Sequence, residues 1–156
     1  MNNIIPINNR RAENYFPQES ELYFDTWERP CYFKGKDDTF YMDEDHKHIV
    51  RMYDDKPLSL GVVGKNYNKL SNEKLCKSIE ETFVEALTDE ELRGVDVKDT
   101  VSYHGGLSIR QYIFPNIRAD IQSRNSDVAF RTIIVNGYDG SSSFKLYNGA
   151  IDFFCS

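Results

Sequence analysis

Cations alternate with aromatic rings in the segment Leu107–Phe114, and this pattern suits contact with a nucleic acid. Successive side chains of an extended strand point to opposite faces, so Arg110, Tyr112 and Phe114 share one face, while the leucine and the isoleucines share the other. Aromatic rings stack on bases and cations neutralise phosphates in proteins that bind single strands. Later residues that extend the set are Arg131, Tyr138 and Lys145. We therefore expect these six residues to bind single-stranded nucleic acid.

The same face has a second explanation, because aromatic side chains are first of all core material. In that case the N-terminal segment, or sequence that is missing from the chain, covers Arg110, Tyr112 and Phe114. Nucleic-acid binding requires that this face meet solvent, whereas a core role requires that it be covered. Exposure therefore separates the two explanations.

A carboxylate, a glycine and three serines follow one another in Asp139–Ser143. Backbone and hydroxyl groups in such a turn can hold a phosphate or a cation, which makes Asp139, Ser141 and Ser142 candidates for a phosphate or ion site. Asp-Gly is also a strong β-hairpin signal, and serines satisfy turn backbone groups by local hydrogen bonds. The hairpin turn is the favoured interpretation.

Three other features fall short of a chemical site. His46 and His48 would project from one face of a strand, but a metal site needs a third ligand, and carboxylates in so charged a run favour a solvated turn. Gly61–Lys65 lacks the first glycine and the final Ser or Thr of a phosphate-binding loop. His104 has no accompanying nucleophile motif. The sequence predicts no metal, no cofactor and no catalytic residue.

Charge is distributed unevenly along the chain. The net charge is -6, with 14 Lys and Arg against 21 Asp and Glu in residues 1–100, and 5 against 4 in residues 101–156. Nucleic-acid binders usually present a basic face, so the acidic part argues against that function and the later part leaves it open. An acidic surface instead steers toward a basic protein partner. The alternative expectation is an interaction or anti-defence protein that binds a host protein.

Composition bounds the broad class. A chain of 156 residues with 40% hydrophobic and 28% charged residues is typical of one soluble domain, with no membrane partner and no secretion signal at its start. Its three cysteines, Cys31, Cys76 and Cys155, are widely spaced and odd in number, which indicates reduced thiols in a cytoplasm. The apolar end at Ile151–Ser156 suggests a gene fragment shortened at its C-terminus.

The positioning elements follow from periodicity and turn residues. Residues 1–27 form an arm, 31–34 pair with 39–42 in a hairpin, and further strands are expected at 48–53, 58–64, 107–114, 128–136 and 144–155. A helix capped by Ser71 or Asn72 carries an apolar stripe of Leu75, Ile79, Phe83 and Leu87. Thr88–Glu91 has the spacing of a capping box. The prediction is a single α+β domain, with a largely antiparallel sheet of about six strands and one main amphipathic helix.

Two segments resemble the phage- and plasmid-like protein family of unknown function, domain of unknown function 932. Leu60–Tyr67, followed by Asn72, resembles its glycine-valine-valine-glycine-x-x-tyrosine…asparagine signature, and Asn136–Ser143, leading to Ile151–Ser156, resembles its histidine-aspartate-glycine-serine segment and its valine-cysteine strand. Tyr138 stands where that family usually has histidine. The match spans residues 60–156.

The resemblance implies a gene of a phage or mobile element acting in the cytoplasm of a bacterial host. It implies no enzyme, because the family has no established catalytic residues. A strand–helix–sheet core of this kind is also similar to phage recombination-annealing proteins, an analogy at the level of fold. The first expectation is therefore a non-catalytic domain that binds single-stranded nucleic acid in recombination or replication.

Overall fold

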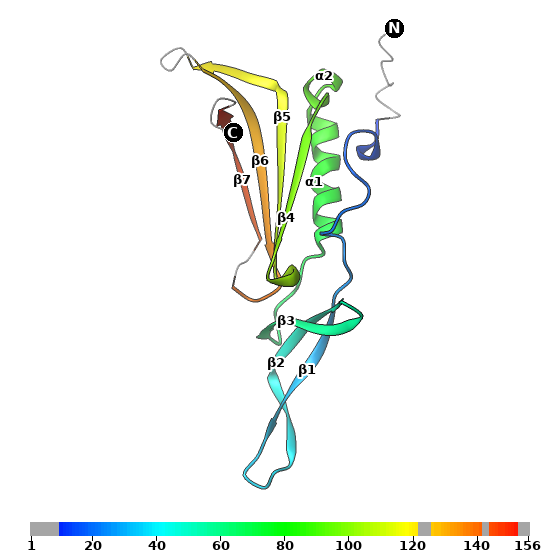
Figure 1. The fold of residues 1–156 in the computed structure, drawn as a ribbon, viewed down its shortest axis with the longest axis vertical. Coiled ribbons are helices and arrows are strands. Elements are labelled where there is room, and N and C mark those ends of the chain that lie inside the picture. Colours follow the sequence, from blue (N-terminus) through cyan, green and yellow to red (C-terminus); the bar gives the residue numbers. More distant parts are fainter. Residues whose placement is uncertain (1–9, 122–125, 142–143, 153–156) are drawn as a thin grey trace.

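The computed structural model describes residues 10–121, 126–141 and 144–152. Its strands form two antiparallel sheets, and one long helix packs on the larger sheet (Figure 1). The predicted α+β class with one main helix is confirmed. Within the described residues the strands number seven and divide into sheets of three and four, where the sequence suggested one sheet of about six.

The smaller sheet consists of β1 (Trp27–Lys34), β2 (Phe40–Tyr53) and β3 (Lys56–Gly64) in that order. The predicted hairpin is confirmed, since Tyr32 pairs with Met42 and Lys34 with Phe40. The turn from β2 to β3 has positive φ at Asp54 and Asp55, which suits the right-handed twist of a two-residue hairpin loop.

The larger sheet has the order β4 (Asp96–Ser102), β5 (Leu107–Ile121), β6 (Ser126–Gly137) and β7 (Lys145–Asp152). Three of these strands match segments that the apolar pattern predicted. The fourth, β4, was not predicted, because its alternating valines and polar residues are few and it lies at the edge of the sheet.

Helix α1 (Asn72–Ala86) begins where Ser71 accepts a hydrogen bond from the Lys74 backbone, so the predicted cap is confirmed. The short helix α2 (Asp89–Leu92) has the predicted capping box, in which Thr88 and Glu91 bond reciprocally. Gly94 follows in the left-handed region, at φ 71°, and turns the chain into β4.

Residues 10–24 and α1 cover one face of the larger sheet, which we call the helix face (Figure 1). The 3-10 helix η2 (Ala12–Asn14) lies in this N-terminal segment, and a second one, η3 (Tyr103–Gly105), connects β4 to β5. Buried members of the helix-face core are Phe16, Cys76, Val84, Leu92, Tyr112, Phe114 and Ile134. The predicted stripe of α1 packs around these residues. The N-terminal segment therefore completes this core together with the helix.

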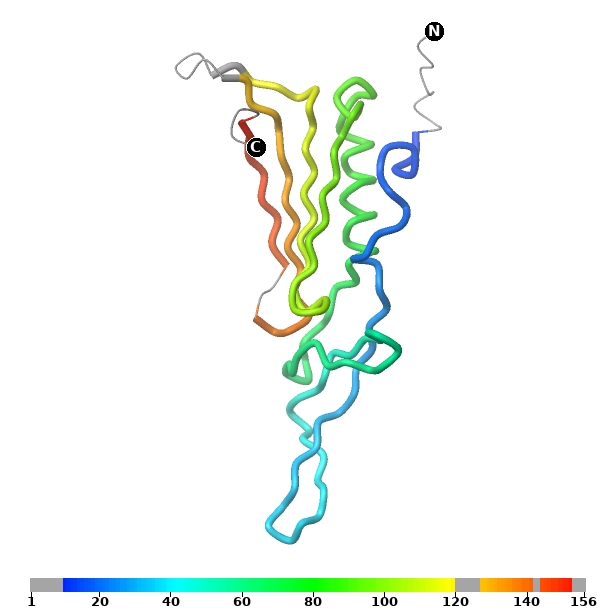
Figure 2. The backbone as a smooth tube through the Cα atoms, in the orientation of Figure 1, coloured from blue at the N-terminus to red at the C-terminus, as the bar shows by residue number. Residues whose placement is uncertain are grey.

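A smaller core joins the two sheets. It contains Ile49, Leu60, Val63 and Tyr138, with Phe24, Leu58 and Tyr67 packed against it. Beyond this joint the β1–β2 hairpin extends away from the larger sheet (Figure 2). The pairing shifts between Pro30 and Cys31, and a β-bulge of this kind bends a strand and increases its twist.

Candidate functional site

The face predicted to bind nucleic acid is the helix face, and it is buried. Arg110, Tyr112, Phe114 and Tyr138 have exposed fractions of 0 to 1%. The expectation that this face meets solvent is wrong, and the explanation in which the N-terminal segment covers it is right. The physical reason is the aromatic packing: the rings of Phe16 and Phe83 lie edge-on to Tyr112 at 5.6 and 5.2 Å between centroids. These four side chains cannot reach a nucleic acid in this conformation.

The buried Arg110 side chain is held by ion pairs and hydrogen bonds within the protein. Its Nε and Nη2 donate to the two carboxylate oxygens of Asp99 at 2.7 and 2.8 Å, and its Nη1 donates to the Tyr23 hydroxyl at 2.7 Å. The carboxylate of Glu80, on α1, lies 3.5 Å from the same guanidinium and accepts from the Tyr112 hydroxyl at 3.0 Å. The Arg110 guanidinium therefore interacts with two carboxylates and a phenol of its own chain, whereas the sequence pattern predicted that it would contact a phosphate.

The pKa values of the two carboxylates in this cluster are shifted in opposite directions. Burial opposes ionisation of Asp99, but the hydrogen bonds from Arg110 and Ser20 outweigh it and lower its pKa. Burial raises the pKa of Glu80 to about 7, against the opposing effect of Arg110. Burial wins at Glu80 because Arg110 already forms a bidentate pair with Asp99. Glu80 is buried on α1 together with Cys76 and Val84, four residues to either side of it.

Tyr138 and Asn72 form a polar hub between the sheets. The Tyr138 hydroxyl accepts from the Asn72 backbone at 2.8 Å, and burial raises the pKa of this phenol to about 12. The Asn72 side chain donates to the Leu22 carbonyl and to Ser108, both at 3.0 Å, and accepts from Asn136 at 2.8 Å. Buried polar groups satisfied in this way specify one arrangement of the elements around them. Tyr138 is therefore a structural residue.

The two segments that carry the family resemblance meet at this joint. A Cβ placed on Gly61 would lie 2.5 Å from the Cα of Asp139, so only glycine permits this approach of β3 to the end of β6. The Tyr67 hydroxyl donates to the Gly137 carbonyl at 2.7 Å. Residues from both motifs thus hold the smaller sheet to the larger one.

The candidate phosphate or ion site is a closed turn. The Asp139 carboxylate accepts from the Ser141 backbone at 2.8 Å and from its hydroxyl at 2.5 Å. Both bonds are local, as the hairpin-turn interpretation expects. Ser142 lies outside the described residues.

The two histidines of β2 also have local partners. His46 contacts Asp43 at 2.9 Å, and His48 contacts the Ser59 hydroxyl at 2.7 Å. Within residues 10–121, 126–141 and 144–152, no group of three His, Cys, Asp or Glu side chains is placed to hold a metal ion.

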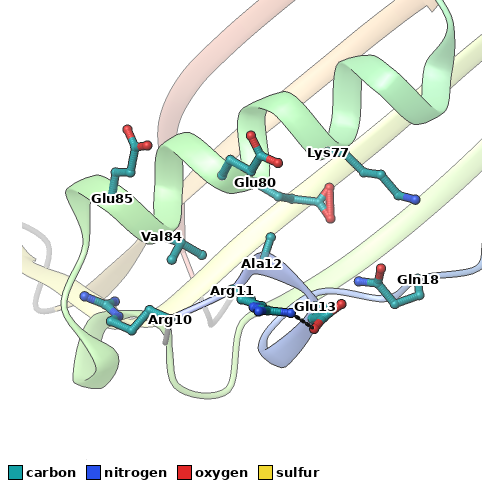
Figure 3. A pocket seen from close by; sticks show the side chains of 10 residues that line it. Arg10, Arg11, Ala12, Glu13, Gln18, Lys77, Glu80, Val84 and Glu85 are labelled. Carbon is teal, nitrogen blue, oxygen red and sulfur yellow. Dashed lines mark ion pairs between the residues drawn. The ribbon is translucent and has the colours of Figure 1, made fainter. Parts of the chain in front are cut away.

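A pocket of about 390 Å³ lies between α1 and the N-terminal segment (Figure 3). Cations and carboxylates line it from both sides: Arg10, Arg11, Glu13, Lys77, Glu80, Glu81 and Glu85. Arg11 pairs with Glu13 at 3.6 Å, and Lys77 pairs with Glu73 at 2.7 Å. Since side chains of both signs line the pocket, its charge favours neither an anion nor a cation.

The larger sheet has a second face, opposite the helix face, which we call the open face. Strand pairing places these residues on it: Lys98, Thr100, Leu107, Ile109, Gln111, Ile113, Arg131, Ile133, Val135, Lys145 and Tyr147, with Asp96 at one end. Most of its leucine, isoleucine and valine residues are half-buried, and Tyr147 is 52% exposed. Of the six residues predicted to bind nucleic acid, only Arg131 and Lys145 lie here with access to solvent.

Sequence reasoning missed a large exposed apolar surface. In residues 31–43, which we call the ribbon, β2 pairs with β1 and with no other described strand, because β3 begins to pair with β2 only at His46. Tyr32, Phe33, Phe40, Tyr41 and Met42 are 46 to 66% exposed. Phe33 stacks on Tyr41 on one side, while Lys34 lies over Phe40 on the other. Adjacent aromatics at Tyr32-Phe33 and Phe40-Tyr41 were the available signal, since adjacent residues of a strand face opposite sides.

Within the described part of the chain, no helix is both long enough and apolar enough to cross a membrane. Comparisons of the sequence with protein-family models and with curated proteins, and of the structure with solved structures, find no match.

Proposed function

We propose that this chain is a non-catalytic protein-interaction module that contacts its partner through the ribbon. The observation that carries the proposal is the set of five large apolar side chains, on both sides of two paired strands, with exposed fractions between 46 and 66%. An apolar set of this kind on an extended element is typical of a protein-binding surface.

The physical reason is that a two-stranded ribbon is only marginally stable alone in water. Among the described residues, no third strand or helix covers residues 31–43, although each side carries aromatic rings. A partner would bury these rings. Aromatic side chains in such positions supply much of the binding energy of protein interfaces.

Charge favours a protein over a nucleic acid as the ribbon's partner. The stretch 31–45 carries five carboxylates, at Asp37, Asp38, Asp43, Glu44 and Asp45, against two cations, Lys34 and Lys36. Phosphates would be repelled by this excess of negative charge, whereas a basic protein surface would be attracted. The partner's contact surface is therefore apolar with cationic residues among or around its apolar side chains.

The resemblance to the phage- and plasmid-like family supports a setting for this contact. A protein of a mobile element would act in the cytoplasm of a bacterial host, and an anti-defence protein would bind a host protein there. Recombination and replication both depend on protein assembly, so such a module suits either process.

Site-specific photocrosslinking in cells tests the proposal. A photoreactive amino acid replaces Phe33 on the ribbon, and in a control chain it replaces Met52, which is 49% exposed outside the ribbon. We expect a discrete protein adduct from position 33 and none from position 52. If position 33 gives no protein adduct, the proposal is wrong.

A second candidate is single-stranded nucleic-acid binding on the open face. It is favoured by Arg131 and Lys145, which flank the Ile133–Tyr147 pair on the same face as the exposed Tyr147 ring. With Lys98 as a third cation, the logarithm of the affinity for single-stranded nucleic acid should fall with the logarithm of salt concentration, at a slope of about -2. Fluorescence anisotropy with an oligonucleotide measures this slope, and loss of binding in Arg131→Ala with Lys145→Ala is expected. Absence of binding at low salt removes the candidate.

A further inference from the structure

We infer, on the basis of the proposed function, that the ribbon's partner is a second copy of this chain, and that the ribbon of one copy packs on the open face of the next. Both surfaces are apolar at their centres and both lack a covering element among the described residues. Contact between the ribbon and the open face would therefore bury the apolar side chains of both surfaces.

The two surfaces carry opposite charge. The ribbon and its flank hold five carboxylates against two cations, while the residues named above for the open face include Lys98, Arg131 and Lys145 against Asp96. Beyond the bulge of β5, Arg118 and Asp127 form an ion pair on the same face. Lys98 pairs with Asp96 at 3.7 Å, and Arg131 donates to Gln111 at 3.3 Å. In the described part of the chain, Arg131 and Lys145 form no ion pair. Two cations on the open face are thus available to the carboxylates of another copy.

One side of the ribbon fits this contact better than the other. Cross-strand pairing puts Phe33 and Tyr41 on the same side as Asp43, and Asp37 accepts from the Tyr41 hydroxyl at 2.9 Å. The opposite side carries Lys34 over Phe40, which would meet cations of the open face. The Phe33–Tyr41 side is therefore the contacting side.

The dimensions of the two surfaces also agree. The four residue pairs from Cys31–Asp43 to Lys34–Phe40 span about 13 Å, at roughly 3.3 Å per residue. The seven residue pairs of β4 with β5, from Asp96–Ile113 to Ser102–Leu107, span about 23 Å by the same rule. The ribbon can lie within the open face with its flanking carboxylates over the cations.

The contact is between copies and runs head to tail. The ribbon extends away from the larger sheet of its own chain, so it does not reach its own open face (Figure 2). A contact between two different surfaces is heterologous, and it generates a closed ring or a continuing chain of subunits.

Sedimentation velocity with paired variants tests this geometry. The ribbon variant is Phe33→Thr with Tyr41→Thr, and its control, on the opposite side of the same strands, is Tyr32→Thr with Phe40→Thr. The face variant is Lys145→Glu with Tyr147→Thr, and its control is Leu146→Thr, which is 45% exposed on the other side of β7. Unchanged circular dichroism shows that each variant retains the fold.

We expect wild-type protein to exceed the 18.2 kDa mass of one chain increasingly with concentration. The ribbon variant and the face variant should each weaken self-association at least tenfold, while both controls associate like wild type. An equal mixture of the two variants should form a dimer with one copy of each and stop there, because only one intact ribbon and one intact face can meet. A wild-type chain that stays monomeric, or a mixture that stays monomeric, overturns the inference.

The crosslinking experiment separates this inference from the proposed function. An adduct at position 33 that joins two copies of the chain, with the second site on the open face, supports both. An adduct with a different protein contradicts the self-association and leaves the proposed function standing. Absence of any protein adduct contradicts both.

Discussion

Gly61 of β3 lies against the backbone of Asp139 at the end of β6, with room for a hydrogen and no more on its Cα. Gly64, three residues later, has no atom within 4 Å of the place where a Cβ would be. Two glycines of one short motif thus have different reasons to be glycine. The first fixes how the smaller sheet is joined to the larger one.

Gly61→Ala should therefore be destabilising, because the new methyl group would have to push β3 away from Asp139. We expect a loss of about 1–3 kcal/mol in the free energy of unfolding, as for overpacking of a tight site. Gly64→Ala is the matched control and should change it by less than about 0.5 kcal/mol. Urea denaturation measures both, and equal effects would contradict the close approach.

Arg110→Met should lower stability far more than Arg131→Met, although the sequence pattern predicts the same role for both residues. Removing the buried guanidinium leaves Asp99 and Glu80 without their cation, which costs about 3–5 kcal/mol. Arg131 is partly exposed, so its replacement should fall within about 0.5 kcal/mol of wild type. Should the methionine variant not fold, Arg110→Lys gives an intermediate loss, since lysine cannot form the bidentate pair. Equal stability of the Arg110 and Arg131 variants would show that Arg110 is not buried.

Glu80 makes stability depend on pH. Its pKa is raised to about 7 in the folded chain, above the value of about 4.3 for an exposed glutamate. Between these values the folded state keeps a proton that the unfolded state has lost, so stability falls as pH rises through this window. The full loss is on the order of 3 kcal/mol. Asp99, whose pKa is lowered, loses its contribution at acid pH, below this window.

Glu80→Gln keeps the acceptor for Tyr112 and removes the titration. We expect the variant to be more stable than wild type at pH 8 and to show a flatter profile between pH 5 and 7.5. Thermal or urea unfolding across this range measures the difference. A wild-type profile that is already flat, or a variant with the same slope, would show that Glu80 is ionised in the folded chain.

Thr88→Ala should remove the capping box that begins α2 and leave the Glu91 backbone amide without its partner. The expected loss is about 1 kcal/mol. Thr82 is a suitable control, because its hydroxyl only bonds back to the Ser78 carbonyl within α1. Thr82→Ala should be neutral or slightly stabilising, since alanine has the higher helix propensity. If both variants lose stability equally, the cap is not formed.

Local features of the fold were predictable, and long-range pairing was not. Ser71, the Thr88 capping box and the turn after Lys34 are specified by residues within a few positions, and the structure confirms them. The strand alternation at Leu107–Phe114 correctly separated two faces. Which face would be covered depended on α1 and on residues 10–24, far away in the sequence, and the assignment was inverted.

The burial of charged residues was also not predicted, because it too depends on elements that are far apart in the sequence. A sequence shows that Arg110 and Glu80 carry charge, and charge usually indicates a surface. It does not show that Asp99 and Tyr23 lie beside them, because that juxtaposition exists only after β4, β5 and the N-terminal segment have come together. The exposed ribbon was missed in turn, because its aromatics resembled core residues and only the topology shows that no third strand of the described residues reaches them.

The separation of 87 residues between Tyr23 and Arg110 also bears on how the chain is made. A ribosome delivers Phe16, Tyr23 and the whole of α1 long before it delivers the strand that shelters them. Until then the aromatic rings of the N-terminal segment and the apolar stripe of α1 lack the sheet surface on which they pack. Residues 10–24 and α1 can therefore reach their final packing only once β5 has been synthesised, and a translational pause just before β5 would prolong the exposure of their apolar side chains.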